Sequence, residues 1–385
     1  MTQTLAPTGL TPEAIDAFAR GRQEPDWLVQ LRRRALDIYL STPLPDTRTE
    51  GWRRTSLSGI KLPDAVPTEA PAATWQAAAG VSILPLDDPR AEQHLGKVVS
   101  PDSDKFTALH YALLNSGVLV YVPRGRVIEE PIWITHRAPF SHTLLVVEDE
   151  AEVRLVEEFE GEPDPLASGV VEQVIGRNAQ VRYVQLQRWA PEVFSFNWQR
   201  AHLGADSHLR TLNVATGARL ARNTVQVVLA GRAAQADLLA VVATDARQHV
   251  DFQTLQDHFG DATRSDLVIH NALRGRSSSN FTGLIRINHT ARQTESSQEQ
   301  KNILLSGQAK ADSDPKLEIF NNDVIRCTHG AAVGPVDPEL VFYLQSRGLT
   351  QQEAERLIVE GFFQSVIEKL AQPALQQAVW DKLNA

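Results

Sequence analysis

The chain has 385 residues, of which 42% are apolar, and this composition is typical of a soluble protein with a sizeable core. Its 38 Lys and Arg residues against 47 Asp and Glu residues give a formal net charge of -9, which argues against a general nucleic-acid or anionic-membrane binder. A single cysteine forms no internal disulfide, the N-terminus lacks a signal-peptide pattern, and no run approaches the roughly 20 apolar residues that span a bilayer. We therefore expect a cytoplasmic protein that binds neither nucleic acid nor membrane.

The first part of the chain, residues 1–95, is predicted to be a helical and loop region. Thr11 and the proline that follows it predict a helix N-terminus, and apolar residues at helical spacing predict a second helix over residues 26–40. Prolines recur between residues 41 and 85, so most of that stretch is expected to be loop. The alanines that follow Thr74 predict one short helix there.

The middle of the chain, residues 96–334, has the residue pattern of a β-protein. Short β-rich runs, such as residues 117–122, 142–148, 180–187 and 266–270, are separated by small polar turns. No convincing long helix lies between these runs from residue 118 onward. The pattern therefore predicts an all-β core.

A repeat in the turns specifies the kind of β-core. Similar turn-then-strand segments begin at Gly176, Gly204, Gly231 and Gly260, which are separated by 28, 27 and 29 residues, and Gly307 begins a related turn later. Equal coil lengths allow the strands of successive coils to stack in parallel. A β-sandwich is the alternative, but its turns recur at roughly 8 to 12 residues. We therefore predict a mainly β fold with a right-handed parallel β-helix, a β-solenoid, flanked by N-terminal and C-terminal helical segments.

The last part, residues 335–385, is predicted to be a helical domain. Asp337 before a proline predicts the start of a helix that ends at Gly348. The sequence Thr350-Gln-Gln-Glu353 is a capping box that predicts the start of a second, amphipathic helix. A third helical segment is expected over residues 374–383.

Cys327 and His329 form the leading candidate site. Residues at i and i+2 of an extended strand point to the same face, so this thiol and this imidazole can approach one soft metal ion. Two ligands do not complete a four-coordinate metal or cluster site, so a functional interpretation requires a partner chain. The alternative is that both side chains only pack, with Cys327 as a small buried hydrophobe.

Other histidines and carboxylates are weaker candidates. We expect structural roles for a set of four histidines, because their spacing matches no standard zinc site: His249, His258, His270 and His289. Acidic pairs leave open an alternative function, a cytoplasmic β-helix enzyme acting on carbohydrates: Glu129 with Glu130, Glu157 with Glu158, and Asp251 with Asp257. No phosphate-binding loop, nucleophile elbow or dinucleotide fingerprint supports other enzyme classes.

Three blocks of sequence, in order, carry a resemblance to a known family. Residues 294–306, 316–334 and 342–349 resemble the signature of the SufB/SufD family of iron–sulfur cluster assembly scaffolds. The Cys-Thr-His-Gly form of the second block is similar to the SufD branch. The expected helical start, β-helix core and helical end fit the family across the whole chain.

The resemblance implies a non-catalytic scaffold subunit of an ATP-driven SufBCD-type complex. Such a subunit pairs with a SufB-like subunit through its β-helix and docks a SufC-like ABC ATPase. Carried to this sequence, His329 and the neighbouring Cys327 hold transient iron or a nascent cluster that is shared with the partner. No cofactor is expected to be stably bound by this chain alone, and the isolated chain is expected to form a homodimer.

The C-terminal helices are the expected contact for the ATPase. These helices contain more apolar residues than a short helical hairpin can bury within itself. We therefore predict four partner-binding residues: Tyr343, Leu357, Phe362 and Phe363. The alternative is that these residues seal the end of the solenoid, as a capping element must.

Overall fold

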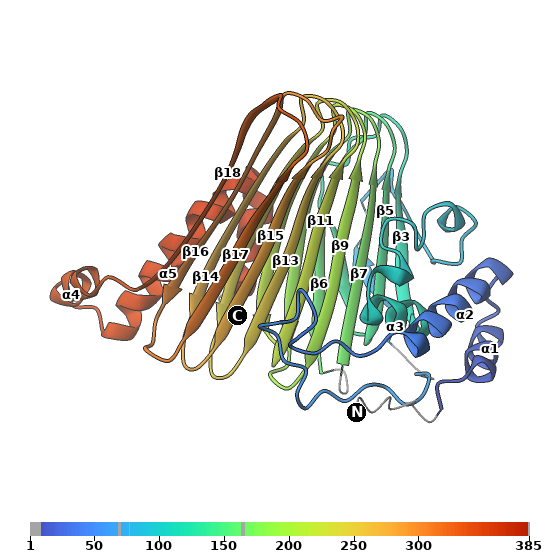
Figure 1. Cartoon of the computed structure of the whole chain (residues 1–385), viewed down its shortest axis with the longest axis horizontal. Helices are drawn as coiled ribbons and strands as arrows, with labels where there is room; N and C mark the ends of the chain where they lie inside the picture. Colours follow the sequence, from blue (N-terminus) through green and yellow to red (C-terminus); the bar gives the residue numbers. More distant parts are fainter. Residues whose placement is uncertain (1–8, 68–70, 77, 163–165, 384–385) are drawn as a thin grey trace.

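The structure, a computed structural model, describes residues 9–67, 71–76, 78–162 and 166–383. Its centre is a stack of parallel β-coils in which two nine-stranded sheets face each other, with helices beside the stack at both ends of the sequence (Figure 1). The predicted β-helix flanked by helical segments is therefore confirmed. No helix of the described part is long and apolar enough to cross a membrane.

The strands alternate between the two sheets along the chain. The first sheet contains, in spatial order, β1 (Thr74–Gln76), β4 (Ile132–His136), β6 (Glu152–Gly161), β8 (Gln180–Trp189), β10 (His208–Gly217), β12 (Gln235–Thr244), β14 (Arg264–Leu273), β16 (Thr294–Leu304) and β18 (Val324–Pro335). The second sheet contains β2 (Ser82–Leu84), β3 (Ser116–Val122), β5 (Phe140–Val147), β7 (Leu166–Ile175), β9 (Phe194–Leu203), β11 (Leu220–Leu229), β13 (His249–His258), β15 (Ser278–Ile287) and β17 (Lys310–Ile319). Only β1 with β4 and β2 with β3 pair antiparallel among the described strands.

The repeated glycines explain the equal coil lengths. Each lies in the turn that leads from the second sheet to the first, and successive ones stack on one another. A Cβ atom on Gly231 would lie 2.0 Å from the backbone nitrogen of Ala205, and one on Gly260 would lie 2.3 Å from the Gly231 carbonyl oxygen. Because neighbouring turns approach so closely, only glycine fits this column. Gly307 is not part of it, since it lies in a turn from the first sheet to the second.

A continuous apolar core fills the space between the two sheets. Inward residues such as Leu155, Val181, Leu238 and Phe281 belong to one buried cluster that extends through the coils. Successive residues of a strand face opposite sides, so every second residue of each strand enters this interior. The core therefore depends on a strand register that repeats from coil to coil.

The N-terminal region packs against the outer face of the second sheet. The helices α1 (Pro12–Gly21) and α2 (Asp26–Ser41) are confirmed, and the Thr11 hydroxyl accepts a hydrogen bond from the Ala14 amide as an N-cap should. The helix expected after Thr74 is wrong: residues 74–76 form strand β1, because they pair with β4, while Ala77 lies outside the described residues.

Three short elements of this region were not predicted. They are the 3₁₀ turns η1 (Ala91–Gln93) and η2 (Pro101–Ser103) and the helix α3 (Lys105–Leu113), which lies within the 96–334 range assigned to the β-core. The signal for α3 is a capping box between Asp104 and Thr107. Its residues join α2 in an apolar cluster on the sheet.

The segment that links these helices to the coils is tied to the second sheet by a buried polar cluster. The Gly51 carbonyl accepts a hydrogen bond from Arg222 at 2.9 Å, and the Arg222 guanidinium lies 3.9 Å from the ring centroid of Trp52. The Thr55 hydroxyl donates to Asp251 at 2.7 Å, and Asp251 also pairs with Arg222. The cluster fixes the course of a loop that has almost no regular structure of its own.

The C-terminal helices cover the outer face of the first sheet. The predicted helices are confirmed as α4 (Pro338–Ser346), α5 (Gln351–Ile367) and α6 (Pro373–Leu383), with a 3₁₀ turn η3 (Glu368–Leu370) between the last two. Apolar residues of α5 and α6 pack on sheet residues such as Leu212 and Val241. By contrast α4 has no buried residue and extends beyond the sheet (Figure 1).

Candidate functional site at the open end of the β-helix

The last coil leaves the end of the stack open. In the described chain β17 pairs only with β15, and β18 pairs only with β16, so each sheet presents one strand with a free edge. A free edge carries backbone N–H and C=O groups that are available to another strand. Four large apolar side chains near it are exposed: Ile319, Phe320, Ile325 and Val333.

Cys327 and His329 lie on this edge strand. In β18 they pair in register with Ser296 and Gln298 of β16, both of which are buried between the two sheets. The two side chains therefore share one face of the strand, as the i and i+2 spacing predicts, and the register places this face toward the interior of the last coil. The structure thus brings the predicted pair to the end of the solenoid, on the strand that has no neighbour beyond it.

The two residues differ in their surroundings. Cys327 is half-buried and packs against a small apolar cluster built from Ile285, Ile287 and Ala291. Burial raises the pKa of its thiol, since an apolar neighbourhood disfavours the thiolate. His329 is exposed. Among the residues that the structure describes, no group of three or more His, Cys, Asp or Glu side chains is placed to hold a metal ion. The pair is therefore an incomplete ligand set.

Polar side chains line the interior behind the pair. The Ser296 hydroxyl lies 2.8 Å from the Ser265 hydroxyl, which is 2.8 Å from Nε2 of His258. Burial lowers the pKa of His258 to about 3, so this imidazole is neutral and is held by its hydroxyl neighbours. A structural role for His258 is consistent with these contacts.

The remaining histidines of the predicted structural set each have different neighbours. His249 is hydrogen-bonded to Ser278 at 2.7 Å, and the ring of His289 packs near Phe320. His270 donates from Nδ1 to the backbone carbonyl of Phe362 at 2.8 Å. These contacts with a hydroxyl group, a ring and a backbone carbonyl are consistent with the structural roles that we expected.

The carboxylates of the alternative enzyme hypothesis are largely engaged in buried contacts. Asp251 is fully buried and accepts hydrogen bonds from Thr55 and Asn280, and Glu157 accepts from Tyr183 in the interior of the coils. Asp257 lies on the outer side of β13, where burial raises its pKa.

The four predicted partner-binding residues fall into two groups. Tyr343 of α4 is 53% exposed and Leu357 of α5 is 49% exposed, so both are accessible to a partner. The Phe362 ring stacks on His270 with a centroid distance of 4.1 Å, and Phe363 is buried against the first sheet. These two therefore hold α5 on the outer face of the first sheet, whereas the alternative for this set places them at the end of the solenoid.

The sequence reasoning missed two further exposed residues beside this surface. Leu340 is 43% exposed and Phe342 is 72% exposed, and both belong to α4, which buries none of its residues. A helix that leaves large apolar residues exposed and buries none of them marks a candidate contact surface. The sequence does indicate this surface, because residues 340–344 are all apolar or aromatic.

Comparisons with known proteins agree with this architecture. Residues 133–362 match the family model described as SUF system FeS cluster assembly, SufBD core domain. The chain is similar to the iron-sulfur cluster assembly protein SufD of Bacillus subtilis, with 30% identity over 93% of each chain. A SufBD family protein of Mycobacterium tuberculosis is 29% identical over 87% of each chain. The SufB protein of Bacillus subtilis is 25% identical over 94% of this chain and 90% of its own length. With the family model covering most of the β-helix and the SufD protein aligning along nearly the whole chain, this protein belongs to the SufB/SufD family of iron–sulfur cluster assembly proteins and is SufD-like.

Proposed function

We propose that this chain is a non-catalytic scaffold subunit of a SufBCD-type complex, in which it pairs with a SufB-like subunit at the open end of its β-helix. The observation that carries the proposal is the position of Cys327 and His329 on the free edge strand β18. A half-complete ligand set at an unpaired edge requires a second chain to supply further ligands.

The open end has the physical properties of an interface between two β-helices. Strands of a partner with the same coil geometry extend the sheets across β17 and β18 by backbone hydrogen bonds. The exposed apolar residues Phe320 and Ile325 then become buried. In the absence of the SufB-like subunit, a second copy of this chain satisfies the same edges and forms a homodimer.

Iron or a nascent cluster is the cargo of this interface. A neutral imidazole and a thiolate are both ligands for iron, and the partner subunit completes the coordination. The cargo is transient, and this chain alone holds no stable cofactor. We place the complex in the cytoplasm, where a free thiol such as Cys327 remains reduced.

The exposed apolar surface of α4 and Leu357 is the proposed docking site of the SufC-like ABC ATPase. Helix α4 contacts α5 but buries none of its residues, while α5 itself is anchored on the first sheet by Phe363 and Val366. A partner held on α4 is therefore connected through α5 to the β-helix. ATP-driven movement of the partner then acts on the first sheet, whose edge strand β18 carries the ligand pair.

His329→Ala tests the cargo site. In a complex co-expressed with the SufB-like subunit and the ATPase, we expect bound iron and sulfide to fall by roughly tenfold or more, because a ligand is lost. Metal analysis and the visible absorption of the purified complex measure this. The matched control is His202→Ala, since His202 is an exposed histidine on the outer face of β9. Equal cluster yield from both variants, with an intact complex by size-exclusion chromatography, would contradict the proposed role of His329.

Tyr343→Ser and Leu357→Ser test the docking site. Each substitution is expected to weaken binding of the ATPase by roughly tenfold, as for an aromatic or aliphatic interface residue, and to leave folding unchanged because both side chains are exposed. Calorimetric titration of the purified chain with the ATPase gives the affinity, and far-UV circular dichroism reports the helices. Phe259→Ser is the control, because Phe259 is an exposed aromatic residue in the turn after β13. If the helix variants bind as tightly as this control, α4 and α5 are not the docking site.

A further inference from the structure

A β-bulge lies in the edge strand immediately before the ligand pair. In the ladder between β16 and β18, Thr294 pairs with Val324, but Glu295 pairs with Arg326, so Ile325 is an extra residue with no partner. A bulge of this kind locally changes the direction in which the following side chains point. Its position two residues before Cys327 decides which face of the strand carries the site.

Because of the bulge, two residues that are three positions apart in the sequence face the same side of the strand. Val324 and Cys327 both pack against the interior cluster of Ile285 and Ile287 at the end of the coils. In a regular strand, residues that are three apart point to opposite faces. If Ile325 were paired as in a regular strand, β18 could place only one of these two side chains in the interior.

The regular pairing that competes with the bulge would move a charge to a half-buried position. If β18 paired with β16 one residue at a time from Val324 onward, Arg326 would lie opposite the fully buried Ser296. Cys327 and His329 would then face away from the interior. Arg326 would then take the half-buried position beside Ile285 and Ile287 that Cys327 now occupies, and it would lose Asp266 and Glu295 as neighbours. Partial burial of a guanidinium without a counter-charge is unfavourable, so this pairing is disfavoured.

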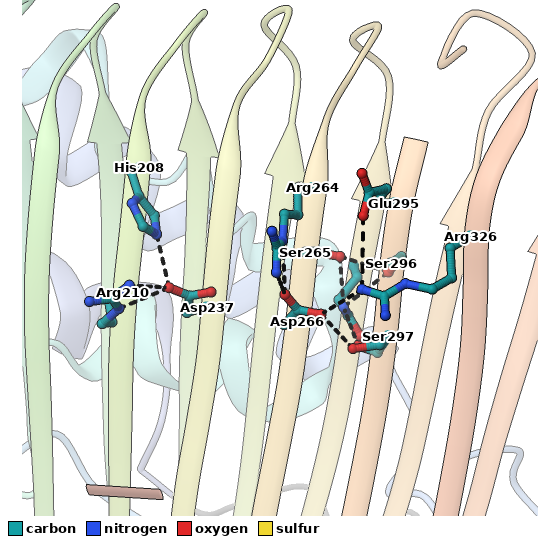
Figure 2. A network of polar contacts seen from close by, with 11 residues as sticks. His208, Arg210, Asp237, Arg264, Ser265, Asp266, Glu295, Ser296, Ser297 and Arg326 are labelled. Atoms are coloured by element: carbon teal, nitrogen blue, oxygen red, sulfur yellow. Dashed lines mark hydrogen bonds and ion pairs between the residues drawn. The ribbon is translucent and has the colours of Figure 1, made fainter. Parts of the chain in front are cut away.

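The observed pairing instead keeps Arg326 on the outer face of the sheet. Its guanidinium is half-exposed and lies 4.0 Å from Oδ1 of Asp266 and 3.9 Å from Oε2 of Glu295. Figure 2 shows Arg326 beside these two carboxylates, with Asp266 also contacted by Arg264 and Ser297. The charge is therefore partly hydrated and has two acidic neighbours on this face.

We propose that Arg326 is a positioning residue: together with the bulge at Ile325, its charge fixes the register of β18 so that Cys327 and His329 face the interior of the last coil. The importance of this orientation for cluster assembly rests on the proposed function, whereas the register itself does not. Arg326 contacts no cargo in this arrangement. It acts by making the alternative pairing unfavourable.

The single cysteine of the chain makes the register measurable. In the isolated protein, we expect Arg326→Leu to raise the rate of Cys327 alkylation by a neutral maleimide, because the apolar residue can occupy the interior and turn the thiol outward. The rate follows the population with an outward thiol, so a tenfold rise in that population gives a roughly tenfold faster reaction. Arg326→Lys keeps the charge and should react at the rate of the unchanged protein. Intact mass against time gives the rates, compared at equal oligomeric state by light scattering.

A second experiment on the register uses the deletion of Ile325. In the Arg326→Leu variant, this deletion removes the extra residue, so that a regular ladder places both Val324 and Cys327 in the interior again. The slow alkylation rate should then return, which also shows that leucine at position 326 has not simply unfolded the last coil. The inference is overturned if Arg326→Leu reacts at the unchanged rate, if Arg326→Lys reacts as fast as the leucine variant, or if the deletion does not restore protection. None of these measurements needs iron or a partner, so they remain separate from the test of His329.

Discussion

Gly231→Ala is expected to lower the free energy of unfolding by about 3 kcal/mol, because the added methyl group has no space between two coils. A Cβ atom there would lie 2.0 Å from the nitrogen and 2.4 Å from Cα of Ala205, and 2.3 Å from the carbonyl carbon of Gly204. All three atoms belong to the backbone, so no side-chain rotation relieves the overlap. The neighbouring coils must separate, which disturbs the parallel ladder between β10 and β12 on this side of the stack.

Urea denaturation followed by tryptophan fluorescence measures this effect, and the chain supplies a close control. Gly307 lies in a turn between β16 and β17, and a Cβ atom on it would have no neighbour within 4 Å. Gly307→Ala should therefore leave the transition midpoint nearly unchanged. If the two variants unfold at the same urea concentration, the close contact between turns does not determine the stability of the stack.

Asp251→Ala is the second substitution with a large expected effect, about 3 to 5 kcal/mol of lost stability. Asp251 is fully buried, pairs with Arg222 and accepts hydrogen bonds from Thr55 at 2.7 Å and from Asn280 at 2.8 Å. Its removal leaves the Arg222 guanidinium without its buried counter-charge and frees the loop that Thr55 anchors. We therefore expect both a lower urea midpoint and faster proteolytic cleavage near residues 50–55.

Asp312→Ala is the matched control for this prediction. Asp312 also pairs with an arginine, Arg54 of the same loop, but this pair lies on the surface, with the aspartate side chain 48% exposed. An exposed ion pair contributes little, below about 1 kcal/mol. Comparable losses from the two aspartate variants would mean that the buried cluster around Asp251 contributes no more than a surface contact.

The sequence contains enough local information to predict the fold of the coils. The spacing of Gly176, Gly204, Gly231 and Gly260 predicts the coil length because the close approach of adjacent turns admits no other residue at the stacked positions. Helix starts at Thr11 and Thr350 follow from capping interactions between neighbouring residues, and both caps are present in the structure. These features are recognisable because the interaction that defines each one is local or periodic.

Features that depend on contacts between distant segments were not predictable in the same way. Residues 74–76 became a strand through pairing with β4, although the alanines after them favoured a helix. Phe363 and Tyr343 are both aromatic residues of the C-terminal helices, yet only the position of the first sheet decides that one is buried and the other exposed. The bulge at Ile325 is likewise defined by its partner strand, since the sequence of β18 alone does not state where pairing shifts.

Within the candidate site, the identity of the two candidate ligands could be predicted from the sequence more readily than the direction in which their side chains point. Alternation along a strand places Cys327 and His329 on a common face, and the structure confirms this relation. Which face they share depends on the register with Ser296 and Gln298, and that information lies about thirty residues earlier in the chain, one coil away.

The two ends of the coil stack are unlike, and this asymmetry limits growth. At the first end each sheet terminates in a three-residue antiparallel strand, β1 or β2, whereas β17 and β18 are full-length strands with free edges. Short antiparallel strands offer little backbone for a further chain to extend. If two such molecules join through their long free edges, no other long free edge remains among the described strands of either one, so we expect association to stop at a pair and not to continue into fibres.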